Sequence, residues 1–259
     1  MTHRIIFALQ KGGVGKTSST VAVSEVLAAA GYKVLVVDFD SQGNATKMLT
    51  QSSIYKFTGH TVMEAIRDRN ADPYIRNVKE NLDLIPAEDK LATFSRYIYT
   101  NKIDNPYAVL KRILEPVEGR YDFVFVDVGP TLGDHMINAI VYADRVYIPL
   151  DTGDFSLDAM IRFMEFVNES RYEGHTNAVI DGIFLTMRDG RSTRYEGEIS
   201  DVIRDSYGDL VFKAEIHRRV KIKEMSAVGI DIVEPSMEDY LDLAEEILQR
   251  TGKKEGHHE

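Results

Sequence analysis

The residues FALQKGGVGKTSS (7–19) carry the strongest structural signal in this chain. They nearly spell the phosphate-binding loop GxxxxGK[ST], but Gln10 stands at the place of its first glycine. Lys11 follows as a second lysine, which the ordinary loop does not require. An apolar, β-branched segment (4–9) precedes the glycines, and a helical pattern (16–31) follows them. This strand–loop–helix order is the context that a phosphate loop needs.

On both sides of this loop, apolar strands and helical segments alternate along the chain. Residues 16–31 place Val21, Val23, Val26, Leu27 and Ala30 on one helical stripe, and Ser236 is the expected N-cap of the last helix. The expected strands are 4–9, 33–40, 82–87, 121–130, 144–151, 178–187 and 210–216. The expected helices are 16–31, 61–69, 88–98, 106–115, a short one before 144, 155–170, 195–208 and 236–252. Such alternation predicts a single α/β domain over 1–252, with a doubly wound, mainly parallel sheet and helices on both faces. We expect the polar tail 253–259 to be disordered.

Composition limits the classes of function. The 259 residues are 44% apolar, enough for a substantial core, and include no cysteine. The lack of cysteine excludes disulfides, thiolate zinc sites and iron–sulfur clusters. No apolar run approaches the roughly 18 residues that span a bilayer, so we expect a cytoplasmic protein. The net charge of −10 argues against coating of nucleic acid by the whole surface but leaves room for a local basic patch.

The loop has the chemistry of an anion site. Backbone N–H groups of 12–17 can surround a phosphate at the positive end of the following helix. Lys16 would neutralise phosphate charge, and the Thr17 hydroxyl would ligate Mg²⁺. The alternative is a glycine-rich turn without a ligand. The loop residues expected to contact a nucleotide are Gly12, Gly13, Val14, Gly15, Lys16, Thr17 and Ser18.

Carboxylates end two of the expected strands. Asp38 and Asp40 end 33–40, and Asp127 ends the apolar run FVFVD. Parallel strands deliver these side chains to the same edge as the loop, where ligands bind in open α/β sheets. A lone acid in such a place is more often a turn or helix cap, but three of them beside a phosphate loop favour a magnesium–phosphate site.

Together these segments resemble a known family. QKGGVGKTSS (10–19), VVDFDSQGNAT (36–46) and FVFVDVGPTLG (123–133) are similar to the deviant phosphate loop, switch I and strand-end aspartate motifs of ParA-type partition ATPases. The MinD cell-division ATPases are related. The similarity continues through LTMRDGRS (185–192), the segment 216–236 and YLDLAEEIL (240–248), and three positions depart from the family pattern: Leu9, Gly129 and His217.

The resemblance implies ATP and Mg²⁺ as cofactors and a face-to-face homodimer that forms on ATP binding. Lys11 would cross to the ATP of the other subunit, as an arginine finger does. Lys11, Lys16 and Asp40 would then be the catalytic residues, with Asp40 polarising the attacking water. Thr17 would bind the metal directly, supported by Asp38 and Asp127. Pro235 matches a loop that packs against adenine.

A basic segment near the C-terminal end points to DNA. HRRVKIK (217–223) carries Arg218, Arg219, Lys221 and Lys223 without an intervening acid, and Arg188, Arg191 and Arg194 could extend the same face. A solvated helix start is the alternative. The aligned region of ParA-type proteins contributes to non-specific DNA binding. An ATP-driven dimer would double the patch, so ATP hydrolysis would switch DNA affinity.

The resulting hypothesis is an ATP-dependent dimeric switch on the nucleoid that acts in plasmid or chromosome partition. The resemblance further implies stimulation of ATP hydrolysis by a ParB-like partner with a basic N-terminal segment. One alternative is the same ATPase positioning a protein cargo. A MinD-like membrane cycle is less favoured, because the tail has no apolar residue after Leu248. A metabolic enzyme of the same fold would not explain Lys11, and the nitrogenase-reductase type would need cysteines.

Overall fold

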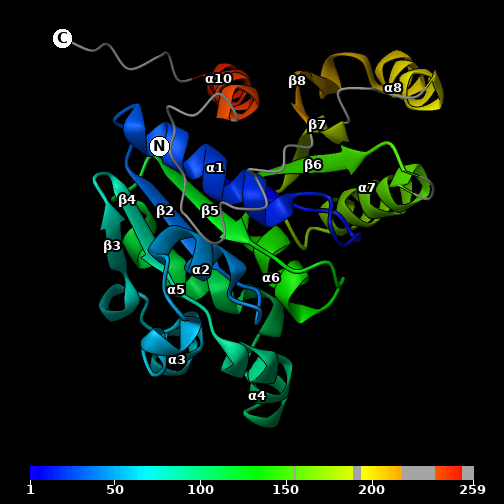
Figure 1. Cartoon of the computed structure of the whole chain (residues 1–259). Coiled ribbons are helices and arrows are strands. Elements are labelled where there is room, and N and C mark those ends of the chain that lie inside the picture. Colours follow the sequence, from blue (N-terminus) through cyan, green and yellow to red (C-terminus); the bar gives the residue numbers. More distant parts are fainter. Residues whose placement is uncertain (154–155, 189–193, 218–236, 253–259) are drawn as a thin grey trace.

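In the computed structural model, the described strands form one sheet in the order β3-β4-β2-β5-β1-β6-β7-β8 (Figure 1). The structure describes residues 1–153, 156–188, 194–217 and 237–252. The strands are β1 His3–Phe7, β2 Val34–Asp38, β3 Arg76–Lys79, β4 Leu82–Ile85, β5 Phe123–Asp127, β6 Arg145–Asp151, β7 Val179–Arg188 and β8 Val211–His217. All neighbours pair in parallel except β3, which runs antiparallel to β4. The predicted fold class is confirmed.

Helices cover both faces of this sheet. Short 3-10 turns link several elements: η1 Ile54–Phe57, η2 Asp72–Tyr74, η3 Asp89–Thr93, η4 Pro106–Ala108 and η5 Gly208–Leu210. The α-helices are α1 Lys16–Ala29, α2 Asn44–Thr50, α3 Val62–Asp68, α4 Phe94–Thr100, α5 Val109–Glu118, α6 Asp134–Tyr142, α7 Ser156–Tyr172, α8 Arg194–Tyr207 and α10 Glu238–Thr251. Apolar residues of α1, α2 and α10 pack on one face, and those of α3 to α8 pack on the other (Figure 1).

The central strands are buried on both faces, as parallel strands between two helical layers must be. Every residue of β2 and β5 is buried, and successive side chains enter opposite cores. In β1, for example, Ile5 packs with α1 and α10, while Ile6 packs with the layer beyond the sheet. The register aligns Asp38 of β2 with Asp127 of β5 at their carboxyl ends. The strand order changes direction at β1, with β5 and β2 on one side of it and β6 on the other, and ligands bind at the carboxyl edge beside such a point in doubly wound sheets.

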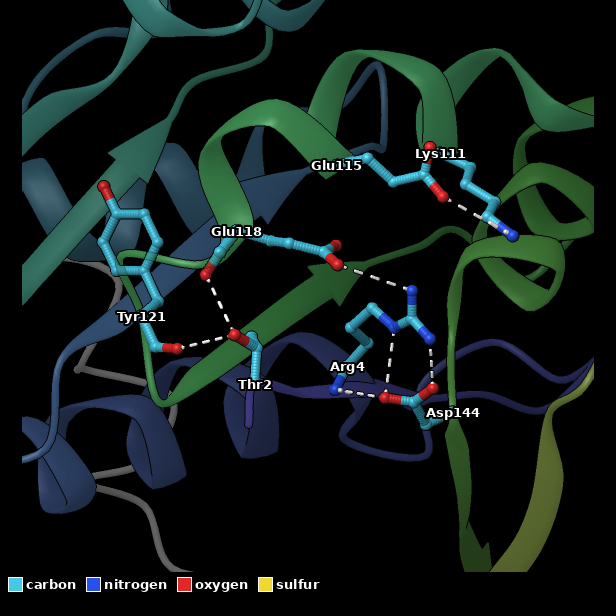
Figure 2. Close-up of polar contacts among 7 residues, drawn as sticks. All are labelled: Thr2, Arg4, Lys111, Glu115, Glu118, Tyr121 and Asp144. Carbon is cyan, nitrogen blue, oxygen red and sulfur yellow. Dashed lines mark hydrogen bonds and ion pairs between the residues drawn. The ribbon is translucent and has the colours of Figure 1, made fainter.

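At the amino ends of the strands, ion pairs around Arg4 stabilise the sheet (Figure 2). The Arg4 guanidinium donates to both oxygens of Asp144, and its Nη1 lies 3.6 Å from the Glu118 carboxylate. The Thr2 hydroxyl donates to the carbonyls of Glu118 and Tyr121 at 3.1 and 2.9 Å. These contacts join the start of β1 to the end of α5 and the start of β6. They stabilise the amino ends of the strands, on the side of the sheet away from the phosphate loop.

Some local predictions were wrong or incomplete. Residues 21–28 of α1 are all buried, so this helix has no single apolar stripe: it lies between the sheet and α10. The short helix α2 and the edge strand β3 were missed. Ser236 lies outside the described residues, and α10 has Met237 at its N-cap without a side-chain hydrogen bond. No described helix has the length and apolar character that crossing a bilayer requires.

Candidate functional site

The loop between β1 and α1 leaves the start of α1 open for an anion. Gly13 and Gly15 have φ of 76° and 86°, the left-handed region that glycine adopts without strain. No atom comes within 4 Å of the place that a Cβ on Gly12 or Gly13 would take, so a ligand can approach the backbone there. Gly15 is the N-cap of α1, with no side-chain cap and no acid in the first turn. The first N–H groups, including those of Thr17 and Ser18, therefore combine with the helix dipole to form an anion site.

Lys16 supplies a buried positive charge to this site. Its side chain is only 6% exposed, and Nζ donates to the Lys11 carbonyl at 2.6 Å. Burial lowers the pKa of Lys16, and the nearby charges of Asp127 and Asp40 act in the opposite direction. A buried ammonium with one carbonyl partner has donors left for phosphate oxygens.

Asp38 is fully buried and already held by the protein. Its Oδ2 accepts from the Thr46 N–H at 2.8 Å and the Thr46 hydroxyl at 2.7 Å, and its Oδ1 accepts from the Asp40 N–H at 3.2 Å. Burial raises the pKa of Asp38 to about 6, against the lowering effect of these hydrogen bonds. Asp38 thus links the start of α2 to the end of β2. Because its oxygens already accept three hydrogen bonds, few of their lone pairs are left to bind a metal.

Asp127 is the opposite case. Both of its carboxylate oxygens are buried, and neither has a hydrogen-bond partner among the described residues. Burial, and next the charge of Asp38, raise the pKa of Asp127 well above its usual value, while the nearby Thr17 hydroxyl, which lies outside hydrogen-bond geometry, and the charge of Lys16 act to lower it. Unpartnered buried oxygens are costly unless a ligand satisfies them. An Mg²⁺ ion fits this donor set, since it takes oxygen ligands from one or two protein groups and completes its shell with phosphate and water.

The carboxyl edge does not offer a cage of protein ligands for a metal. Among the residues that the structure describes, no group of three or more acids or histidines is arranged to bind one ion. Thr17 at the start of α1 and Asp127 at the end of β5 are the predicted groups that could hold magnesium together with a bound phosphate.

Asp40 lies on the turn that follows β2. Its Oδ1 accepts from the Gln42 N–H at 3.1 Å, and a Cβ added to Gly129 would lie 3.0 Å from its Oδ2. Gly129, the departure from the family pattern, therefore gives the Asp40 carboxylate room beside the segment after β5. In the described part of the chain, nothing donates a hydrogen bond to Oδ2, which is left to accept from a water.

A histidine that sequence reasoning missed supports this turn. The His135 ring lies 5.1 Å from the Phe39 ring and 5.0 Å from the Phe94 ring, between centroids. Its Nε2 is 3.2 Å from the Leu91 carbonyl oxygen, and burial lowers its pKa. Phe39 directly precedes Asp40, so this aromatic cluster holds the position of the turn. A lone histidine in an amphipathic helix gives no signal for such a contact.

Lys11 points toward the end of β6. Its Nζ lies 2.8 Å from Oδ1 and 3.1 Å from Oδ2 of Asp151, and it also bonds the Ser156 hydroxyl at the start of α7. The Lys11 side chain is about one quarter exposed. Neither partner was expected, although Asp151 ends a predicted strand in the same way as Asp38 and Asp127, and that signal could have identified it.

The structure thus brings together the loop residues 11–18, Asp38, Asp40 and Asp127. Other predicted site residues lie outside the described residues: Pro235, Arg218, Arg219, Lys221, Lys223 and Arg191. Arg188 and Arg194 belong to β7 and α8, but their side chains are not among those described.

The chain matches a family model and several known proteins. Residues 2–180 match a family model described as an AAA domain. The chain is 33% identical to the chromosome-partitioning ATPase Soj of Treponema pallidum, over 98% of this chain and all of that protein. It is 35% identical to the sporulation initiation inhibitor protein Soj of Bacillus subtilis, over 92% of this chain and 95% of that protein. It is 31% identical to the chromosome partitioning protein ParA of Caulobacter vibrioides, over 95% and 94%.

Solved structures share the fold. The ATP complex of a McdA variant from Cyanothece superposes with a TM-score of 0.85 at 22% identity, covering 99% of both chains. A plasmid partition protein from Borrelia burgdorferi bound to AMPPNP gives 0.82 at 24% identity, covering 96% of this chain and all of that one. Cobyrinic acid a,c-diamide synthase from Mycobacterium smegmatis, with an ATP analogue and magnesium, gives 0.84 at 24%, covering 98% of each. At these identities the likeness concerns the fold.

Proposed function

The chain belongs to the ParA/Soj family of ATPases, and we propose that it is an ATP-dependent dimeric switch acting in plasmid or chromosome partition. It is a P-loop ATPase that uses ATP and Mg²⁺ and releases ADP and phosphate. The observation that carries the proposal is the Lys11 side chain: its ammonium is held beside the phosphate loop by Asp151 and Ser156 and makes no contact with the loop itself.

The N–H groups of 12–17 and the ammonium of Lys16 bind and orient the phosphates. When a phosphate binds, the Lys16 ammonium would exchange its hydrogen bond to the Lys11 carbonyl for one to a phosphate oxygen. The free-energy cost of this exchange is small, because one acceptor replaces another at the same loop. The Thr17 hydroxyl and the Asp127 carboxylate would hold magnesium, directly or through its waters. When bound, this ion neutralises charge that develops on the phosphate oxygens.

Asp40 orients the water that attacks the terminal phosphate. Its Oδ1 is fixed by the Gln42 N–H, and its Oδ2 faces the segment after β5. In this arrangement one oxygen sets the position of the carboxylate and the other accepts a hydrogen bond from the water. The contact of Phe39 with His135 and Phe94 keeps the turn from moving away.

Lys11 would connect the nucleotide to dimer formation. In the single subunit, Asp151 and Ser156 satisfy its ammonium. A second subunit carrying ATP offers a more strongly charged acceptor, so Lys11 would leave Asp151 and cross the interface. ATP would then be required for a stable dimer, and loss of its terminal phosphate would return Lys11 to Asp151.

We further propose that the ATP-bound dimer binds DNA without sequence preference through Arg218, Arg219, Lys221 and Lys223, with Arg191 on the same surface. This proposal is supported by the density of positive charge in the segment 217–223, in a chain whose net charge is −10. Affinity for DNA depends steeply on the number of phosphates neutralised, so two copies bind where one releases. The protein would act on the nucleoid in the cytoplasm, with hydrolysis stimulated by a ParB-like partner that has a basic N-terminal segment.

Salt titration tests the DNA surface. Arg218→Glu should weaken binding of duplex DNA in the presence of ATP and reduce the slope of log K against log salt by about 0.9 for each phosphate that is no longer neutralised. Nucleotide affinity should not change. Arg96→Glu, the same charge reversal on the exposed face of α4, is the matched control and should leave the slope intact. An unchanged slope in Arg218→Glu would move the DNA site elsewhere.

A further inference from the structure

The Asp40 carboxylate lies directly against the backbone of Gly129, in the segment that joins β5 to α6. A Cβ added to Gly129 would lie 3.0 Å from Oδ2, 3.3 Å from Cγ and 3.6 Å from Oδ1 of Asp40. The whole carboxylate group therefore faces the place that a side chain at this position would take. The two shortest distances are closer than ordinary van der Waals contact, so any residue with a Cβ would displace the carboxylate.

The backbone that carries Asp40 is held on several sides. The Asp40 N–H donates to Oδ1 of Asp38 at 3.2 Å, and the Asp40 carbonyl accepts from the Gly43 N–H at 3.0 Å. The Phe39 N–H, one residue earlier, donates to the Asp127 carbonyl at 2.8 Å and so joins the ends of β2 and β5. Because these hydrogen bonds fix the main chain, the side chain of Asp40 is the part that yields to a close neighbour.

The segment after β5 is anchored on its own side. Val128, which precedes Gly129, is 1% exposed and belongs to the apolar core on the α6 face of the sheet. A Cβ at Gly129 would thus be relieved by rotation of the Asp40 carboxylate. That rotation would weaken the 3.1 Å hydrogen bond that the Gln42 N–H donates to Oδ1, and it would turn Oδ2 away from its present direction.

We propose that Gly129 is a positioning residue for ATP hydrolysis. Because it has no side chain, it leaves a slot in which Asp40 keeps Oδ1 on the Gln42 N–H and directs Oδ2 toward the attacking water. The position of the carboxylate rests on contacts within the chain. The effect on the rate rests on the proposed function, because it requires Asp40 to orient the water. Misplacement by about 1 Å can cost about 100-fold in rate, so a shift of a few tenths of an ångström should cost about three- to tenfold.

The position of the carboxylate can be tested without hydrolysis. Gly129 has no positive φ, so Gly129→Ala adds a Cβ without backbone strain. Gly133→Ala is the matched control in the same segment: the nearest atom to its Cβ, in Thr131, is 3.9 Å away, and its φ is −132°. In ¹⁵N-labelled, nucleotide-free protein, Gly129→Ala should move the Gln42 amide resonance toward its position in Asp40→Ala, which lacks the acceptor. Gly133→Ala should leave this resonance in place.

Single-turnover hydrolysis of ATP with Mg²⁺ tests the effect on the rate. Gly129→Ala should lower the rate about three- to tenfold and change ATP affinity by less than about twofold, whereas Gly133→Ala should alter neither. In an Asp40→Ala background, Gly129→Ala should cause no further loss of the residual rate, because the carboxylate that it displaces is gone.

Three results would overturn the positioning role of Gly129. They are a Gln42 resonance that Gly129→Ala leaves unchanged, an equal loss of rate with and without the Asp40 carboxylate, and a loss of ATP affinity in place of rate. A Gln42 resonance that moves while the hydrolysis rate stays constant would instead count against the proposed function, since Asp40 would then have no part in orienting the water.

Discussion

At the scale of single residues, Asp127 shows most clearly that the site is built for a ligand. A buried carboxylate with two unpartnered oxygens destabilises the chain that carries it, and natural structures retain few such groups. Asp38, its neighbour in the sheet register, is equally buried but fully hydrogen-bonded. The contrast separates Asp38, which organises the site, from Asp127, which we propose binds a cation.

The cost of Asp127 can be measured through its pH dependence. Its raised pKa means that the folded state holds a proton that the unfolded state has released, so the stability that this proton confers is lost as pH rises through the folded-state pKa. Asp127→Asn should therefore raise the free energy of unfolding of the nucleotide-free protein at pH 8 by about 1–3 kcal/mol. Below about pH 3 the two proteins should converge, since the carboxyl is then protonated in both states.

Urea denaturation at several pH values provides this comparison, with Asp201→Asn on the exposed face of α8 as the control. A variant that is less stable than the parent at pH 8, or a difference that grows at low pH, would contradict the account. Asp127→Asn should also lose Mg²⁺-dependent ATP hydrolysis.

His135 tests whether packing behind Asp40 matters for chemistry. His135→Ala removes the ring that contacts Phe39 and Phe94, so the turn that carries Asp40 should become more mobile. Because Asp40 would then orient the attacking water less well, kcat should fall by about tenfold or more. ATP affinity should change little, because the phosphate loop is untouched. His135→Phe keeps an aromatic ring in the cluster and should recover most of kcat. A loss of ATP affinity in place of kcat would assign His135 to nucleotide binding.

At the scale of elements, the pairing of β7 with β8 depends on a close approach at Gly182. A Cβ there would lie 2.0 Å from the Phe212 ring, which is buried among aromatic neighbours and cannot withdraw freely. Gly182→Ala should lower the free energy of unfolding by about 1–3 kcal/mol through overpacking.

Gly197 in α8 is the matched control. No atom lies within 4 Å of its Cβ position, so Gly197→Ala should stabilise the protein by about 0.5–1 kcal/mol through helix propensity. Thermal unfolding of the two variants should therefore move the midpoint in opposite directions. Equal shifts would mean that the space around Gly182 is not limiting.

The sequence predicted the alternation of elements because buried parallel strands and helices differ in length and period. It failed at β3, whose residues RNVK are mostly polar and pair only at the antiparallel edge, and at α2, which begins at a left-handed Gly43 rather than at a polar cap. The loop and the strand-end acids were predictable since they follow directly from buried runs. The contact of Lys11 with Asp151 was not, because it joins residues 140 positions apart.

At the scale of the whole molecule, the proposed activity involves two copies of the chain. The carboxyl edge gathers the phosphate loop, Asp40 and Asp127, and Lys11 stands beside them, satisfied within its own subunit. A protein that only hydrolysed ATP as a monomer would need Lys16 but would have no use for Lys11. We therefore propose that ATP assembles a dimer and that Lys11 is required for it.

Light scattering during size-exclusion chromatography tests this claim in an Asp40→Ala chain, where slow hydrolysis keeps ATP bound. Addition of ATP and Mg²⁺ should double the mass of that chain. The double variant Asp40→Ala/Lys11→Ala should still bind ATP but should keep the mass of a monomer. The double variant Asp40→Ala/Lys16→Ala should neither bind ATP nor dimerise. A chain that binds ATP yet stays a monomer, or a Lys11→Ala variant that dimerises as its parent does, would contradict the account.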